Sequence, residues 1–174
     1  MIVRIISLLL AATLASCGQA DLDGITKRFT EQNESFVKMY SMIQADTKVS
    51  DCFAVGTDHI GEYWEHDNKW NSNKNYQRKI TLDQVLKEVG LSGQRYQEYL
   101  SLFKVTGSER IEYCPKKPSW ARIMVHRNGL AVSGCLTTVN INGDVSVPAT
   151  ENKPGYSSEI RPLGNGWYLN HDCT

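Results

Sequence analysis

The sequence predicts a single α+β domain, in which N-terminal helices over about residues 22–46 and 82–106 pack on a C-terminal antiparallel β-sheet over about residues 109–171. Three observations support this fold class. Apolar residues recur at helical spacing in the first half of the chain, and they alternate with polar residues in the second half. Asn-Gly pairs, which favour tight hairpins, punctuate the second half.

The first helix is predicted over residues 22–46, a segment rich in Lys, Glu and Gln. Its apolar stripe comprises Leu22, Ile25, Phe29, Phe36, Tyr40 and Ile43. A stripe with this spacing faces the core in most globular proteins, although a helix that binds a partner has the same pattern.

Residues 82–106 are predicted to form a pair of helices joined by a short turn. Thr81 supplies an N-cap and Gly90 a C-terminal stop for the first helix, and Ser92 and Gly107 do the same for the second. Neither helix carries an obvious catalytic group.

The second half of the chain alternates apolar and polar residues, which predicts strands joined by hairpins. Residues 128–129 (Asn-Gly) are predicted to form a two-residue loop that places Val125 opposite Val132. A change in the parity of the apolar positions predicts a β-bulge near Thr137. A final hairpin is predicted around residues 164–166.

Residues 1–16 have the features of an export signal, with a positive charge at Arg4, an apolar run and small residues at the end. The apolar run has about ten residues, whereas a transmembrane helix needs about twenty. The order Leu14-Ala15-Ser16-Cys17 resembles the lipobox of bacterial lipoproteins. This resemblance covers only the signal and its motif, and it implies cleavage before Cys17 and acylation of that residue.

The acyl chains on Cys17 would hold the protein on a lipid bilayer, because several chains together give stable anchoring. Residues 17–21 would then form a short lipidated tether, and residues 22–174 the globular domain. The protein is expected to be a bacterial membrane lipoprotein that faces the periplasm. Gly18 is not the aspartate that retains lipoproteins at the inner membrane, so the outer membrane is favoured if the source is Gram-negative.

Net charge excludes some partners. The chain has 19 basic and 19 acidic side chains, and removal of the signal, which holds Arg4 and no acid, leaves a charge near −1. A balanced charge provides no basic field for nucleic acid. The sequence also contains no pattern that calls for a cofactor.

The four cysteines after Cys17 predict two disulfides, because an even number in an exported chain favours an oxidised framework over a metal site. Parity along the predicted strands suggests one bridge between Cys114 and Cys135. The second bridge would then join Cys52 to Cys173.

The most unusual segment is HIGEYWEHDNKWNSNKNYQRK, residues 59–79, which is predicted to be a long polar loop. Four aromatic residues in it are candidates for partner binding: Tyr63, Trp64, Trp70 and Tyr76. Aromatic side chains of this kind contribute strongly to binding surfaces. An equally valid interpretation is that one or two of the rings fold back into the core.

The same segment contains a weak candidate metal site formed by His59, Glu62 and His66. On a helix these side chains would share one face and could ligate zinc with an open position. No known zinc-protease spacing is present, and Gly61 and the asparagines disfavour a sustained helix.

These observations predict a membrane-anchored exported lipoprotein with a non-enzymatic binding domain for a periplasmic or envelope protein. By analogy alone, a sharper form of this hypothesis is an immunity or inhibitor lipoprotein. Two alternatives remain at the level of sequence: a metal-dependent hydrolase that acts on cell-envelope material, and a structural envelope lipoprotein.

Overall fold

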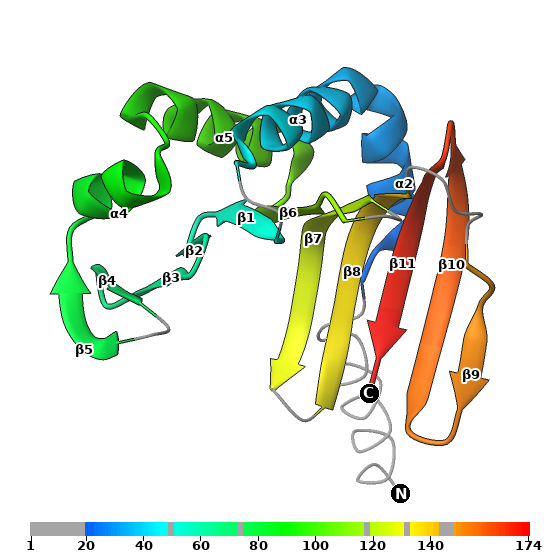
Figure 1. Ribbon diagram of the computed structural model, residues 1–174. Coiled ribbons are helices and arrows are strands. Elements are labelled where there is room, and N and C mark those ends of the chain that lie inside the picture. The colour runs from blue at the N-terminus through cyan, green and yellow to red at the C-terminus, as the bar shows by residue number, and fades with distance from the viewer. Residues whose placement is uncertain (1–19, 49–50, 73–74, 117–118, 131–132, 143–147) are drawn as a thin grey trace, which may run out of the picture.

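A computed structural model describes residues 20–48, 51–72, 75–116, 119–130, 133–142 and 148–174. Within these residues the chain forms one eleven-stranded antiparallel sheet and four helices (Figure 1). The strand order is β5-β4-β3-β2-β1-β6-β7-β8-β11-β10-β9. The export signal and Cys17 lie outside the described residues, so the lipobox hypothesis stays a prediction.

The helices are α2 (Leu22–Glu31), α3 (Asn33–Asp46), α4 (Leu82–Val89) and α5 (Gly93–Thr106). The strands of the first half are β1 (Phe53–Gly56), β2 (His59–Ile60), β3 (Tyr63–His66), β4 (Lys69–Ser72) and β5 (Asn75–Ile80). Those of the second half are β6 (Arg110–Cys114), β7 (Trp120–Leu130), β8 (Ser133–Asn142), β9 (Glu151–Lys153), β10 (Tyr156–Gly164) and β11 (Trp167–Cys173).

The predicted arrangement of N-terminal helices on a C-terminal sheet was wrong. In the sequence, strands β1–β5 lie between the helix pair α2–α3 and the helix pair α4–α5. The sheet is therefore not confined to residues 109–171, and the helices do not form an N-terminal block. β1 joins the two halves because it pairs with β6, with Phe53 opposite Tyr113. The strands within residues 59–80 are two to six residues long and rich in amides and charges, so none is long enough to show a clear period of two.

The first helical segment is broken rather than continuous. Gln32 ends α2 and precedes α3, with φ −117° and ψ 24°, and its N–H donates to the carbonyl of Arg28. The break lets both halves of the apolar stripe reach the core, since Phe29 and Phe36 contact each other with ring centroids 5.1 Å apart. One continuous helix over residues 22–46 was therefore an incorrect prediction.

The helical pair over residues 82–106 is confirmed together with its capping residues. The Thr81 hydroxyl accepts from the backbone N–H of Gln84 in a full capping box, and the Ser92 hydroxyl caps α5. Gly90 and Gly107 end the two helices in the left-handed conformation that glycine favours. None of the helices in the described residues has the length and hydrophobicity needed to cross a bilayer.

The hairpin between β7 and β8 turns later than predicted. Leu130 pairs with Ser133, so the connection falls at residues 131–132, which lie outside the described residues, and Asn128-Gly129 belongs to the strand. The predicted opposition of Val125 and Val132 was therefore wrong. The register shift of this hairpin lies between Met124 and His126, so Val125 on β7 forms the β-bulge. The bulge was predicted near Thr137 on β8, which pairs with His126.

The last hairpin is confirmed, with Gly164 paired to Trp167 around the predicted turn. One face of the sheet packs against the helices and forms a single core with them. The sheet contributes residues with no exposed surface, namely Val55, Ile60, Ile111, Ile123, Val139 and Leu169. The helices cover them with Phe36, Met39, Ile43 and Tyr99.

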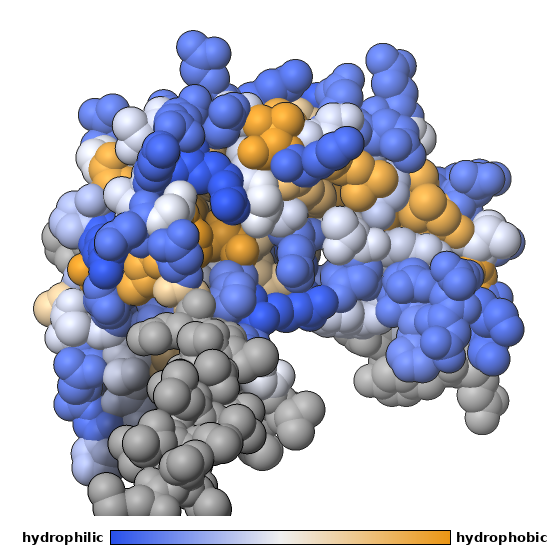
Figure 2. All heavy atoms as spheres, turned by 180° about the vertical axis from the view of Figure 1, so that it is seen from behind, coloured by the Kyte–Doolittle hydropathy of each residue, from blue (hydrophilic) through white to orange (hydrophobic). Residues whose placement is uncertain are grey.

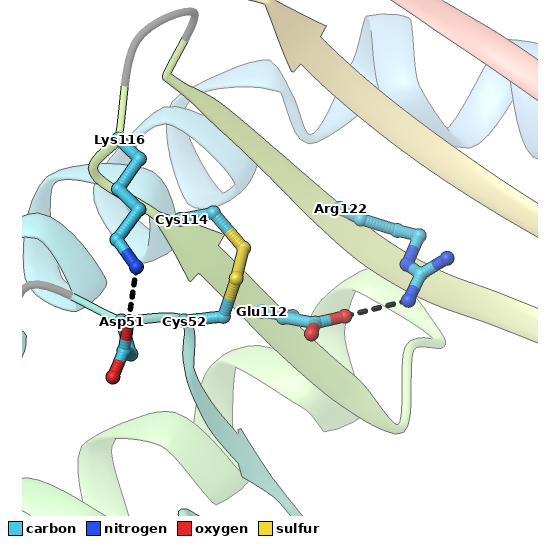
Figure 3. The surroundings of a disulfide bond; sticks show 6 residues. All are labelled: Asp51, Cys52, Glu112, Cys114, Lys116 and Arg122. Atoms are coloured by element: carbon cyan, nitrogen blue, oxygen red, sulfur yellow. Dashed lines mark hydrogen bonds and ion pairs between the residues drawn. A yellow bond between two sulfur atoms is a disulfide. The ribbon is translucent and has the colours of Figure 1, made fainter.

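Two disulfides are present, but the predicted pairing was wrong. Cys52 pairs with Cys114 (Figure 3), and Cys135 pairs with Cys173. The sheet order explains the difference, because β7 lies between β6 and β8 and separates Cys114 from Cys135. Cys135 instead lies directly opposite Cys173 in the β8–β11 ladder, and Cys52 immediately precedes β1, the neighbour of β6.

Candidate functional site

The face of the sheet that points away from the helices carries the candidate site, and we call it the open face. Side chains on this face alternate with the buried core residues of the same strands, so they are set by the strand period of two. In Figure 1 no helix lies in front of β8, β11 and β10, and Figure 2 shows the molecule from the opposite side, where hydrophobic residues appear among hydrophilic ones. The open-face residues of β6, β7, β8 and β11 include Arg110, Glu112, Arg122, Thr138, Asn140, Tyr168, Asn170 and Asp172.

A cluster around Arg110 occupies the first part of the open face. The His59 imidazole stacks on the Trp64 indole, with ring centroids 3.9 Å apart and planes inclined by 9°. The Arg110 guanidinium carbon lies 5.4 Å from the Trp64 ring centroid. One terminal nitrogen of Arg110 lies 3.1 Å from His59 Nδ1, and the other lies 3.8 Å from the Met124 sulfur. We call these four residues the Arg110 cluster.

The contacts of His59 define its tautomer. Arg110 can only donate, so Nδ1 of His59 accepts, and Nε2–H donates to the Gly61 carbonyl at 2.5 Å. This is the neutral form of the imidazole. Burial, together with the nearby positive charge of Arg110, lowers the pKa of His59 from its ordinary value, and the Gly61 carbonyl and two carboxylates only partly offset this.

Arg110 has no carboxylate within ion-pair distance among the described residues, although its side chain is half-buried. The neighbouring acids are engaged elsewhere: Arg127 binds Asp58 at 3.1 Å and Glu109 at 3.2 Å. Glu112 accepts from Arg122 at 2.6 Å (Figure 3). Burial therefore dominates and lowers the pKa of Arg110.

Asp58 also retains bonding capacity. Its Oδ2 accepts from Arg127, whereas its Oδ1 is buried without a hydrogen-bond partner in the described part of the chain. A guanidinium has five N–H donors, and the contacts above use two nitrogens of Arg110. The cluster and its neighbour thus offer both donors and an acceptor to a ligand.

A second, polar area covers β7, β8, β10 and β11. Hydrogen bonds tie its side chains together: Tyr156 donates to Asp172 at 2.9 Å, and Asn170 donates to Asp172 at 2.7 Å. The Asn140 amide donates to the Thr138 hydroxyl at 2.8 Å. A depression of about 280 Å³ lies here, lined by Trp120, Arg122, Leu136, Thr138, Asn140, Asn142, Tyr168, Asn170 and Asp172.

The aromatic residues predicted to bind a partner divide between the two faces. Trp64 lies half-buried on the open face, in the Arg110 cluster. Tyr63 and Trp70 are each only 6% exposed and belong to the core, and the Tyr63 hydroxyl donates to Glu88. These two rings pack in the interior, as the alternative interpretation proposed. Tyr76 is part of β5, but its side chain lies outside the described residues.

His59, Glu62 and His66 are not gathered into one site. His59 is held by Arg110 and Gly61, whereas the His66 side chain is 81% exposed and faces Asp67. In the described residues, each group of three side chains that could hold a metal contains a disulfide pair, and none contains His59 or His66.

Sequence reasoning missed Arg110 and Arg122, the charged centres of the open face. The signal was present, because Arg110 and Glu112 flank the apolar Ile111, and Arg122 alternates with Ala121 and Ile123. The polar positions of a strand with period two mark its second face. What they could not indicate was that none of the four described helices covers this face.

No protein-family model matches the chain, and no curated protein or solved structure is significantly similar to it. The interpretation of the open face therefore depends on its own geometry and chemistry.

Proposed function

We propose that the protein is a membrane-anchored exported lipoprotein whose domain is a non-enzymatic binding module, and that the open face binds a protein of the periplasm or cell envelope. The observation that carries this proposal is the state of Arg110. A half-buried guanidinium normally has a carboxylate partner, because an unpaired buried charge is costly. Arg110 instead lies among Trp64, His59 and Met124 with no ion pair in the described residues.

The composition of the surface supports a protein partner. Arginine and aromatic residues are enriched at the energetic centres of protein interfaces, where they are surrounded by polar contacts that exclude water. Arg110 and Trp64 are such a pair of residues, in contact through the guanidinium and the indole ring. The hydrogen-bonded polar area around Asn140 and Asp172 adjoins them on the same face. An acidic side chain of the partner would complete the bonding of Arg110.

The anchor defines where this binding would take place. Acylation of Cys17 and the short tether over residues 17–21 would keep the open face close to a membrane, with the outer membrane favoured in a Gram-negative cell. An immunity or inhibitor protein, which blocks a toxic enzyme by covering it, is the sharper form of this proposal.

The test is capture of the partner by the acylated, disulfide-bonded protein from solubilised envelopes, followed by affinity measurements with the purified partner. We expect Arg110→Gln and Trp64→Ala each to weaken the affinity at least tenfold. Arg161→Gln is the matched control, because Arg161 on β10 is already paired with Asp23 and Glu159. Equal affinities for all variants would show that the Arg110 cluster is not the binding surface.

A further inference from the structure

A second group of reactive side chains lies where β8 begins and β11 ends, outside the Arg110 cluster. The ligand atoms of Cys135, His171 and Cys173 all lie within 4.8 Å of one another. Their positions follow from the strand register, since Cys135 is opposite Cys173 and Thr137 is opposite His171. All of these side chains point to one face of the sheet, because they are two residues apart on each strand.

His171 is oriented toward the sulfur atoms. The Thr137 hydroxyl is 2.8 Å from His171 Nδ1, and this contact fixes the ring so that Nε2 lies 3.2 Å from the Cys173 sulfur. An imidazole held at one nitrogen by a neighbouring group, with the other nitrogen aimed at the metal, is the usual arrangement of a histidine ligand.

A second imidazole lies in the same row of the sheet. Thr137 pairs with His126 on β7 as well as with His171 on β11. His126 Nε2 is buried and has no hydrogen-bond partner in the described part of the chain. A buried nitrogen that lacks a partner is unusual in a folded protein. His126 therefore adds a second imidazole nitrogen in the row next to the group of Cys135, His171 and Cys173.

The backbone would hold the two cysteines in place without their bond. On one side, His171 and Thr137 are paired in the ladder. On the other side, the N–H of Thr174 donates to the Gly134 carbonyl at 3.0 Å, and the N–H of Gly134 donates to the Thr174 carbonyl at 3.1 Å. Cleavage of the disulfide would therefore leave both sulfurs on paired backbone.

We propose that reduction of the Cys135–Cys173 disulfide creates a copper(I) site formed by Cys135, Cys173 and His171. A protein dithiol supplies two electrons and two protons by thiol–disulfide exchange, so that the disulfide becomes two thiols and the dithiol becomes a disulfide. Cu(I) then binds both sulfurs as thiolates and His171 Nε2, and the two thiol protons pass to solvent. Cysteine thiolates are soft ligands that select Cu(I), and imidazole also binds copper.

The other disulfide lacks this chemistry and provides an internal control. Its neighbouring group is the carboxylate of Glu112, a harder ligand, which is already bound by Arg122 (Figure 3). Cys114 is only 3% exposed but its partner Cys52 is exposed, and Cys135 and Cys173 are both half-buried. Thiol–disulfide exchange requires access to one sulfur, so a dithiol can reach either disulfide. Only the Cys135–Cys173 pair has an imidazole among the three ligand atoms of its group.

The experiment is an anaerobic competition for Cu(I) between the acylated full-length protein and bicinchoninate, before and after reduction with a phosphine. We expect one Cu(I) per reduced protein and none in the oxidised form. Binding should persist when Cys52 and Cys114 are both replaced by serine, and disappear when Cys135 and Cys173 are replaced. His171→Ala should weaken the affinity at least tenfold.

X-ray absorption of the copper-loaded wild-type protein supplies a test that needs no variant. It should show two sulfur neighbours and one nitrogen neighbour around the copper. Coordination by sulfur alone, or copper binding that survives the loss of Cys135 and Cys173, would overturn the proposal. A higher affinity for Zn²⁺ than for Cu(I) in the reduced protein would overturn the assignment to copper.

Discussion

The imidazole of His59 lies parallel to the indole of Trp64 across the β2–β3 pair, with ring centroids 3.9 Å apart. The stack leaves one edge of the imidazole for Arg110 and the other for the Gly61 carbonyl. A proton added to His59 would convert the acceptor Nδ1 into a donor and place a second positive charge against Arg110. The electrostatic state of the open face therefore depends on His59.

The first prediction follows from this relationship and concerns pH. Burial holds the pKa of His59 in the folded protein below its unfolded value near 6.5. The unfolded chain therefore binds this proton at a higher pH than the folded protein does. The free energy of unfolding is not reduced by His59 above about pH 6.5, and it falls as the pH falls through the folded pKa. Denaturant unfolding between pH 7.5 and 4.5 should show a smaller loss of stability in His59→Gln than in the wild type. His66→Gln, at an exposed histidine, should retain the wild-type pH dependence, and a wild-type profile in His59→Gln would contradict the prediction.

Truncation of the two tryptophans in the 59–79 segment should lower the unfolding free energy by different amounts. Trp70→Ala removes a ring that is 6% exposed in the core, which should cost about 3–5 kcal/mol of unfolding free energy. Trp64→Ala removes a stacking and a cation–π contact at a half-buried site, which should cost about 1–2 kcal/mol. Urea unfolding of both variants measures the difference, and similar losses for the two would argue against their placement on opposite faces.

Sequence reasoning succeeded where the determinants of structure are local. The ends of α4 and α5 follow from Thr81, Gly90, Ser92 and Gly107, whose side chains or backbone preferences act within one helical turn. The last hairpin follows in the same way from the turn at residues 164–166. The presence of two disulfides follows from the number of cysteines.

It failed where the structure depends on pairing between distant segments. The strands within residues 59–80 are shorter than the window in which a period of two can be detected. Their existence depends on β1, which joins β6 more than fifty residues away, as in the pair between Val55 and Ile111. The disulfide pairing depended on the same sheet order. The open-face site required knowledge of which face of the sheet the four described helices pack against.

The next prediction concerns close contact between β7 and β8. A Cβ atom added at Gly134 would lie 2.3 Å from the carbonyl oxygen of Asn128, a backbone atom that cannot move aside alone. Gly134→Ala should therefore cost about 3 kcal/mol of unfolding free energy, at the upper end of common substitutions. Gly93→Ala is the control, since that position has open space at the start of α5 and should be neutral or stabilising. Equal stability of both variants in thermal unfolding would refute the close approach.

The two disulfides should contribute similar free energies. They span sequence separations of 62 and 38 residues, and loop-closure entropy then assigns each about 4 kcal/mol. Peptide mapping under non-reducing conditions should recover Cys52 linked to Cys114 and Cys135 linked to Cys173. Replacement of either pair by alanines should lower the midpoint of urea unfolding to a comparable degree. Any peptide that links Cys114 to Cys135 would contradict the strand order of the sheet.

The final prediction tests the anchor. In the proposed lipoprotein, the signal is cleaved before Cys17 and the Cys17 sulfur is acylated. Cys17→Ser removes the sulfur to which the lipid would be attached. We expect the variant to lose metabolic labelling with a fatty acid and to leave the membrane fraction. Its unfolding midpoint should equal that of the wild type, because the two disulfides and the described core do not involve Cys17. Ser16→Ala, which keeps a small residue before the cysteine, should still be acylated. A Cys17→Ser protein that still floats with membranes would remove the basis for placing the open face at a bilayer.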